Sequence, residues 1–243
     1  MKLWQVIRVL GPVDLRSTLR DPLLGWMIFV PFAPAVIMRF AWPWAADFLN
    51  QRYHFDLNLY ESVLFGFFLI FVPFLYGVLI GMLLLDERDA RTLTALRVTP
   101  LTPGYYMVYR LMIPMVLSLI CYILILPVLP IQLPGLGMRL LIATPAFIQT
   151  SLFALLMGTT VPNKVAGLAL YKALSIIFFL PMLLFFWDSP LTWVLAVLPA
   201  FWQLKLILLE GTGVFWIVLG VGLIYHGLLL LILQRRFLHL RLD

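Results

Sequence analysis

Charged residues are scarce in this sequence. Asp, Glu, Lys and Arg make up 12% of its 243 residues, whereas hydrophobic residues make up 63%. Soluble domains carry roughly 25% charged residues, and a soluble fold of this size could not bury so much apolar surface. A bilayer removes the need to bury it, because lipid is then the solvent. The composition therefore predicts an integral membrane protein, which also suits the 15% aromatic residues and 17 prolines.

Catalytic and metal-binding motifs are also missing. The sequence has no Gly-Lys pair, hence no P-loop, and no H-E-x-x-H or G-x-S-x-G motif. Its one cysteine, Cys121, cannot form an intrachain disulfide, and its three histidines are too scattered for a metal site. We therefore expect no metal and no ATPase site on this chain. His226 lies inside the last hydrophobic run, where an ionisable group is a candidate pathway residue. The alternative is a neutral histidine hydrogen-bonded inside a helix bundle.

Long hydrophobic runs are abundant instead. Six of them have about the 20 residues that a spanning helix needs, so we predict an all-α membrane protein with six spans in a single domain, residues 1–243. The runs cover residues 23–41, 62–85, 111–129, 140–160, 167–187 and 213–233. The first run ends in the belt Trp42-Pro43-Trp44, and we expect a polar connection to follow. That connection carries Asp47, Arg52, His54 and Asp56. In the second run, Gly77 and Gly81 lie four residues apart and would allow close helix approach.

One apolar stretch does not fit a simple span. Residues 191–209 are split by Pro199 and carry Lys205 in their second half. Each half has about ten residues, too few to cross a bilayer. We therefore predict a re-entrant or interfacial hairpin within residues 189–212. The alternative is a seventh span, which would put the two chain ends on opposite faces.

The first 22 residues predict an interfacial segment. Four apolar residues fall at the spacing of one helix face, so this segment can lie in the headgroup layer. They are Leu3, Trp4, Ile7 and Leu10. We expect Gly11-Pro12 to break this helix. No short apolar segment with a small-residue cleavage site follows the basic start, so we expect no cleavage.

Basic residues are distributed unevenly over the connections. With six spans, both termini share one side with the second and fourth connections. Thirteen of the 17 Lys and Arg fall on that side: Lys2, Arg8, Arg16, Arg20, Arg88, Arg91, Arg97, Arg110, Lys164, Lys172, Arg235, Arg236 and Arg241. By the positive-inside rule, we expect a multi-pass protein of the cell membrane with both termini in the cytoplasm. A seventh span would weaken the asymmetry to ten against seven.

The connection 86–106 is the most charged segment. We predict a short cytoplasmic helix within the segment 86–103, in which Leu93 and Leu96 share a face. Its acidic start is favoured by the helix dipole, and Thr99-Pro100 ends it. The acidic residues are Asp86, Glu87 and Asp89. The alternative is a solvated loop whose charges only set the topology.

This connection resembles the first cytoplasmic connection of type 2 ABC exporter permeases, the membrane subunits of ATP-driven drug and polysaccharide exporters. Those proteins carry an acidic residue, a Gly-Thr-Leu, another leucine and a Thr-Pro-Leu here. The matching residues are Glu87, Thr92, Leu93, Leu96, Thr99, Pro100 and Leu101, and Arg91 replaces the family glycine. Elsewhere, Asn163-Lys164-Val165 resembles the fourth connection of the fluoroquinolone exporter branch. Leu198-Pro199 and Phe201-Trp202 resemble the re-entrant region of that branch.

The resemblance implies a mechanism in which two permease subunits, identical or homologous, pair in the membrane. Two separate ABC ATPase subunits would dock from the cytoplasm and carry ATP and Mg, so this chain would bind no cofactor. The coupling residues would be Asp86, Glu87, Arg88, Asp89, Arg91, Thr92, Leu93, Leu96, Thr99 and Pro100, with Asn163 and Lys164 as a second cytoplasmic contact. The substrate would be drug-like or lipophilic. A permease of the same fold for polysaccharide, lipid or heme is the alternative.

Two other protein classes are less well supported. An ion-coupled secondary transporter needs carboxylates within the membrane, and the runs have no Asp or Glu near their middle. Glu61, Arg110, Arg139 and Lys172 lie near run ends, where long side chains can reach the interface. A lipid phosphatidyltransferase would share the Asp86 and Asp89 pair but needs a glycine and two aspartates that are missing. Nucleic acid is not an expected partner, because the basic residues flank apolar runs.

Overall fold

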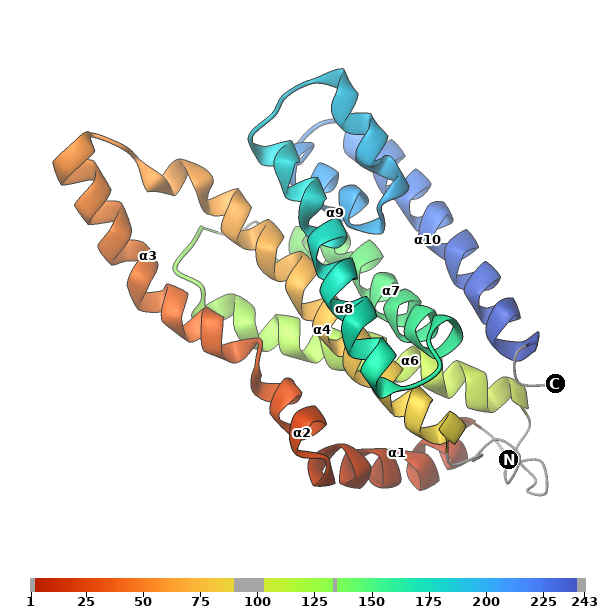
Figure 1. Ribbon diagram of the computed structural model, residues 1–243. Coiled ribbons are helices and arrows are strands. Elements are labelled where there is room, and N and C mark those ends of the chain that lie inside the picture. Colours follow the sequence, from red (N-terminus) through yellow and green to blue (C-terminus); the bar gives the residue numbers. More distant parts are fainter. Residues whose placement is uncertain (1–2, 90–102, 133–134, 240–243) are drawn as a thin grey trace.

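The computed structural model describes residues 3–89, 103–132 and 135–239, and every regular element within these ranges is helical (Figure 1). The elements are α1 (Leu3–Arg20), α2 (Pro22–Phe29), α3 (Phe32–Tyr53), η1 (Leu57–Tyr60), α4 (Glu61–Asp89), α6 (Pro103–Ile125), η2 (Leu126–Val128), α7 (Leu136–Thr160), α8 (Lys164–Phe179), η3 (Leu180–Phe185), η4 (Pro190–Val197), α9 (Pro199–Leu208) and α10 (Val214–His239). Elements labelled η are short 3₁₀ helices.

Six helical stretches in these ranges are long and apolar enough to cross a membrane. They are Leu24–Tyr53, Leu57–Arg88, Tyr105–Val128, Leu136–Thr160, Lys164–Phe185 and Val214–Phe237. The prediction of an all-α integral membrane protein with six spans is therefore confirmed. The start of α1, the last turn of α4 and the end of α10 lie at the same end of the bundle (Figure 1). We call this the α1 end.

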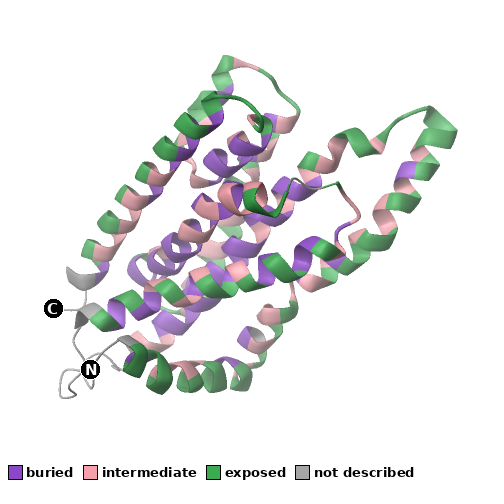
Figure 2. Cartoon of the chain, turned by 180° about the vertical axis from the view of Figure 1, so that it is seen from behind, coloured by how far each residue is buried: buried purple, intermediate pink, exposed green. Residues whose placement is uncertain are grey.

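Helices α4 and α7 form the centre of the bundle, and buried residues concentrate along them (Figure 2). They run parallel in close contact, as predicted from Gly77 and Gly81. A Cβ atom at Gly77 would lie 2.5 Å from Cβ of Phe153 and 2.6 Å from the carbonyl oxygen of Thr150. One at Gly81 would lie 2.6 Å from Cβ of Met157. The absence of a side chain at these two positions is what lets the backbones approach.

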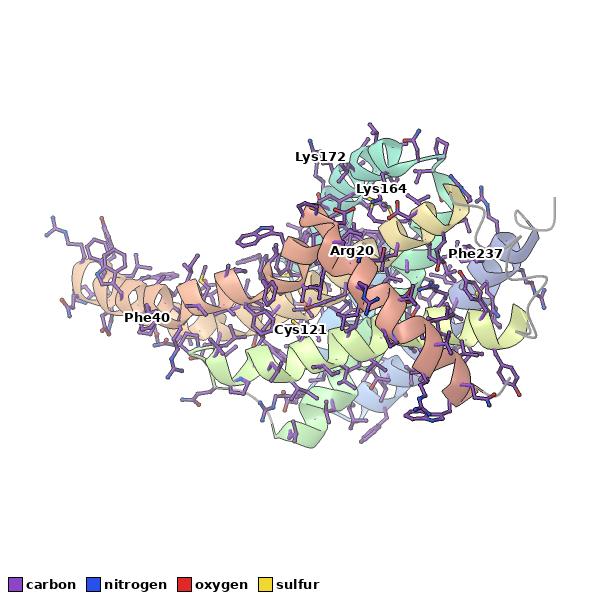
Figure 3. All side chains as sticks on the ribbon, turned by 90° about the horizontal axis from the view of Figure 1, so that it is seen from below. Arg20, Phe40, Cys121, Lys164, Lys172 and Phe237 are labelled. Atoms are coloured by element: carbon purple, nitrogen blue, oxygen red, sulfur yellow. The ribbon has the colours of Figure 1, made fainter. Side chains whose placement is uncertain are left out.

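The first span lies at the periphery of the bundle. Only 17% of its most apolar stretch is buried, against 83% for the second span. Figure 3 shows Phe40 on α3, far along the helix that leads away from the other elements, and its side chain is 73% exposed. One contact that holds this span is a hydrogen bond of 2.9 Å from the hydroxyl of Tyr76 to the carbonyl oxygen of Ile28.

Two predicted helix boundaries are wrong. Helix α1 continues through Pro12, although proline cannot donate a backbone hydrogen bond. Val6 and Thr18, on either side, are buried against the bundle, and this packing holds the helix together. The first span does not end at residue 41. Helix α3 runs on to Tyr53 and ends where His54 adopts a left-handed φ of 52°, so Asp47 and Arg52 lie on a helix instead of in a connection.

The stretch 191–209 has the two-part structure expected from Pro199. The 3₁₀ helix η4 and helix α9 meet at Leu198, and the indole nitrogen of Trp202 donates to the carbonyl oxygen of Ala196 over 3.2 Å. Neither helix is long enough to span, so a seventh span is absent from the described part of the chain. Most residues of α9 are buried inside the bundle. Entry of this hairpin into the bilayer, like the interfacial position of α1, stays a prediction.

Candidate functional site

The predicted coupling residues fall into two groups. Asp86, Glu87, Arg88 and Asp89 form the last turn of α4. Arg91, Thr92, Leu93, Leu96, Thr99 and Pro100 lie outside the described residues, as does the rest of the predicted coupling helix. The prediction that the acidic residues begin that helix is wrong, because the apolar helix α4 continues through Asp89 and they lie at its C-terminal end. The structure therefore shows how the helix that leads into this segment, α4, and the helix that follows it, α6, are held.

Arg110 on α6 joins three helices. Its side chain is 1% exposed. Its Nη1 lies 2.5 Å from Oδ2 of Asp14 on α1, and its Nη2 lies 3.2 Å from Oδ1, a bidentate pair. The same guanidinium forms an ion pair with Glu87 on α4. One buried cation thus ties α1, the end of α4 and the start of α6 together.

Two tyrosines complete this arrangement. The hydroxyl of Tyr109 donates to Oδ2 of Asp14 over 2.6 Å, and the hydroxyl of Tyr106 donates to Glu87. Nε of Arg110 donates to the hydroxyl of Tyr106 over 3.3 Å. We call these five residues the Arg110 cluster. Within it, both carboxylates and the guanidinium have hydrogen-bond partners. Buried charges need such partners, because an ion removed from water loses its hydration.

Lys164 makes a second junction at the α1 end. Its Nζ lies 2.8 Å from Oδ2 of Asp21 and 2.8 Å from Oδ2 of Asp86. Asn163, just before it, accepts a hydrogen bond of 3.0 Å from the backbone N–H of Ala166 and so caps α8. Of the predicted second contact, Lys164 therefore lies directly against the predicted coupling residue Asp86, while Asn163 holds the start of the helix that carries it.

Arg88 fixes the same turn of α4 to the end of α7. Its Nη2 donates to the carbonyl oxygen of Val161 over 2.7 Å and also to that of Pro162. A guanidinium is favoured here, because the last carbonyls of a helix lack partners and carry partial negative charge. Three successive residues of α4, Asp86, Glu87 and Arg88, thus contact α8, α6 and α7.

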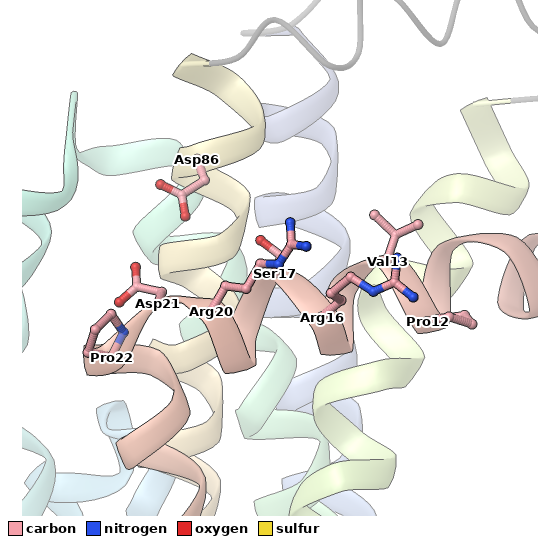
Figure 4. A pocket seen from close by; sticks show the side chains of 8 residues that line it. All are labelled: Pro12, Val13, Arg16, Ser17, Arg20, Asp21, Pro22 and Asp86. Carbon is pink, nitrogen blue, oxygen red and sulfur yellow. The ribbon is translucent and has the colours of Figure 1, made fainter.

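A cavity of about 670 Å³ opens beside this junction (Figure 4). It is lined by Pro12, Val13, Arg16, Ser17, Arg20, Asp21, Pro22 and Asp86. Arg16 and Arg20 lie along α1, while Asp21 and Asp86 face each other at one end (Figure 4). The cavity combines two guanidinium groups with carboxylates that already share Lys164.

His226 lies apart from these groups, fully buried on α10. Its Nδ1 is 2.7 Å from the carbonyl oxygen of Gly222, one turn earlier on its own helix. This backbone contact is the arrangement expected of a histidine hydrogen-bonded inside the bundle. A role in a substrate pathway stays a prediction. Another buried polar contact, 2.7 Å from Nε2 of Gln203 to Oε1 of Gln149, joins α9 to α7.

The sequence-based interpretation of Arg110 was wrong. Its position near a run end suggested a side chain that reaches the interface, but the structure buries it between two carboxylates. Asp14, Asp21, Tyr106 and Tyr109 were not predicted as site residues either. The available signal was an arginine with apolar or aromatic residues on both sides of it in the sequence, because such a residue needs a buried counter-charge.

These features define a multi-pass membrane protein whose charged contacts gather at one end of the bundle. Residues 14–234 match the family model described as "Fluoroquinolones export permease protein Rv2686c-like", and the chain belongs to this permease family. It is similar to Fluoroquinolones export permease protein Rv2686c of Mycobacterium tuberculosis (strain ATCC 25618 / H37Rv). It is equally similar to Fluoroquinolones export permease protein MT2760 of strain CDC 1551 / Oshkosh. Each is 32% identical over 237 residues, covering 96% of this chain and 94% of the relative. The predicted resemblance to the fluoroquinolone exporter branch is confirmed.

Proposed function

We propose that this chain is the membrane-spanning permease subunit of an ATP-driven ABC exporter that carries fluoroquinolone-like, lipophilic drugs out of the cell. The observation that carries the proposal is family membership along nearly the whole chain, with relatives named as fluoroquinolone export permeases. The sequence supplies no P-loop, so the ATP and Mg sites belong to a separate ATPase subunit.

The contacts at the α1 end support a coupling role for residues 86–103. An ATPase that displaces this segment would pull on the last turn of α4 and the first turns of α6. Arg110 ties both helices to α1, while Asp86 and Arg88 tie α4 to α8 and α7. A displacement would therefore reach three further helices of the bundle, α1, α7 and α8. Coupling needs such rigid connections, because a loosely held segment would absorb the motion.

The proposed assembly contains two permease chains, this one with a second copy or a homologue, and two ATPase subunits. The α1 end lies on the cytoplasmic side of the cell membrane, as the distribution of Lys and Arg favours. The translocation pathway runs between the permeases. Nucleic acid has no part in it.

The test uses this chain co-expressed with its ATPase in membrane vesicles. ATP-dependent movement of a fluorescent fluoroquinolone is measured, and the ATPase is recovered with a tagged permease. We expect Leu96→Glu, in the predicted coupling segment, to abolish both readouts while membrane insertion is unchanged. Leu59→Glu is the matched control, because Leu59 is 79% exposed on η1, just before the other end of α4, and it should leave both readouts intact.

Two results would contradict the proposal. Drug movement driven by a proton gradient without ATP would indicate a secondary transporter. Full recovery of the ATPase with Leu96→Glu would remove residues 86–103 from the coupling contact while leaving the exporter class intact. The two parts of the proposal can thus fail separately.

A further inference from the structure

We propose that the cavity between α1 and the end of α4 binds the phosphate of an anionic phospholipid, with Arg16 and Arg20 as its ligands. The two arginines lie four residues apart, which places them on one face of α1. Both side chains are exposed and line the cavity (Figure 4). A volume of about 670 Å³ admits a headgroup.

The charges in the cavity favour an anion. Within the described residues, neither Arg16 nor Arg20 forms an ion pair. The carboxylates of Asp21 and Asp86 lie 2.8 Å from the Nζ of Lys164 and are partly neutralised by it. The lining itself carries two guanidinium groups and two carboxylates, and Lys164, outside the lining, brings the net charge of the five groups to +1. Two guanidinium groups on one face suit phosphate, because each can donate two parallel hydrogen bonds.

The position of α1 favours a lipid as the source of that phosphate. By helical spacing, Trp4, Leu15 and Leu19 form a strip along α1 next to the arginine strip. Their side chains are 70%, 57% and 57% exposed. An exposed apolar strip beside a basic one is typical of a helix that lies in the interface, where the apolar side chains enter the acyl boundary. Arg16 and Arg20 are then level with lipid phosphates.

Binding at this cavity would act on the same turn of α4 that carries the coupling contacts. Asp86 lines the cavity and also pairs with Lys164 on α8. Arg20 and Lys164 lie near each other (Figure 3), because Lys164 pairs with Asp21, the residue that follows Arg20. A bound headgroup would therefore add a contact between α1 and the end of α4.

The experiment measures binding, which does not depend on transport. Purified chain in detergent is titrated with phosphatidylglycerol or phosphatidylcholine, and bound lipids are counted by native mass spectrometry. We expect one phosphatidylglycerol site, whose affinity Arg16→Gln/Arg20→Gln lowers about 30-fold, from about 1 kcal/mol or roughly fivefold for each charge. Phosphatidylcholine should bind more weakly in the unchanged chain. In the single variants R16Q and R20Q, the affinity for phosphatidylglycerol should fall about fivefold. These variants keep the test usable if the double variant does not accumulate.

The matched control is Arg235→Gln/Arg236→Gln. These two exposed arginines lie near the end of α10, at the same end of the bundle, but outside the cavity. Their loss should leave the site unchanged. The proposal would be overturned if both double variants lost affinity for phosphatidylglycerol equally, or if R16Q/R20Q lost none. Displacement of phosphatidylglycerol by millimolar inorganic phosphate would mean that free phosphate, not lipid, is the ligand.

Discussion

Removal of Arg110 should destabilise the bundle more than removal of any exposed arginine. The substitution Arg110→Met keeps an unbranched apolar stem, lacks the guanidinium group and so deletes the charge. Asp14 and Glu87, 16% and 15% exposed, would then face each other across α1 and α4 without a counter-ion. Their hydroxyl donors, Tyr109 and Tyr106, would remain.

The magnitude follows from the burial of the pair. Removing one member of a buried ion pair costs about 3–5 kcal/mol, because the remaining charge is left uncompensated. For Arg110→Met we expect a loss in this range. Asp14→Asn should cost less, about 2 kcal/mol, because an amide still accepts from Tyr109 and Glu87 still neutralises Arg110. The double variant should be less damaged than the sum of the singles by about 1.5 kcal/mol or more.

The assay is unfolding by SDS titration in mixed micelles, followed by the fluorescence of the eight tryptophans. Arg235→Met serves as the control, since an exposed substitution changes stability by less than about 0.5 kcal/mol. Additive effects of Arg110→Met and Asp14→Asn would refute the reasoning, because they would show that the two side chains do not interact. An Arg110→Met variant as stable as the control would refute it more directly.

Three further predictions concern the same bundle. Gly77→Ala and Gly81→Ala should each cost about 1–3 kcal/mol in the SDS titration, because the new Cβ meets the main chain or Cβ atoms of α7 within about 2.6 Å; Gly137→Ala, with nothing within 4 Å, should cost nothing. Asn163→Ala should destabilise by about 1 kcal/mol through the lost cap of α8, and Asn163→Asp should restore it. Lys164→Gln should cost less than about 1 kcal/mol, because this side chain is 31% exposed, and high salt should shrink the difference from the unchanged chain; a larger, salt-independent loss would contradict the account of this junction.

Much of the fold could be predicted from the sequence, because the bilayer makes spans readable as long apolar runs. The six spans, the break at Pro199 and the close approach at Gly77 and Gly81 are all local signals. The course of α1 through Pro12 was not predictable in the same way. It depends on the packing of Val6 and Thr18 against other helices, and the residues next to Pro12 in the sequence do not show this packing.

Only part of the candidate site could be predicted from the sequence, for a similar reason. Asp86, Glu87, Arg88 and Lys164 were predicted as contact residues because the charged connections that carry them resemble those of type 2 ABC exporter permeases. Arg110 was misjudged, since its partner Asp14 is 96 residues away in sequence. A hydropathy pattern shows that a charge interrupts an apolar run but not which distant carboxylate balances it.

The glycine contacts between α4 and α7 have a mechanical consequence. Backbones in such close contact cannot slide past each other without first separating, so these two helices move as one body. The outlying span of α2 and α3, with little buried surface, has no comparable constraint. A swing of that span about the fixed central pair is therefore the least costly rearrangement of this chain, while Arg110 keeps α1 attached to the end of α4.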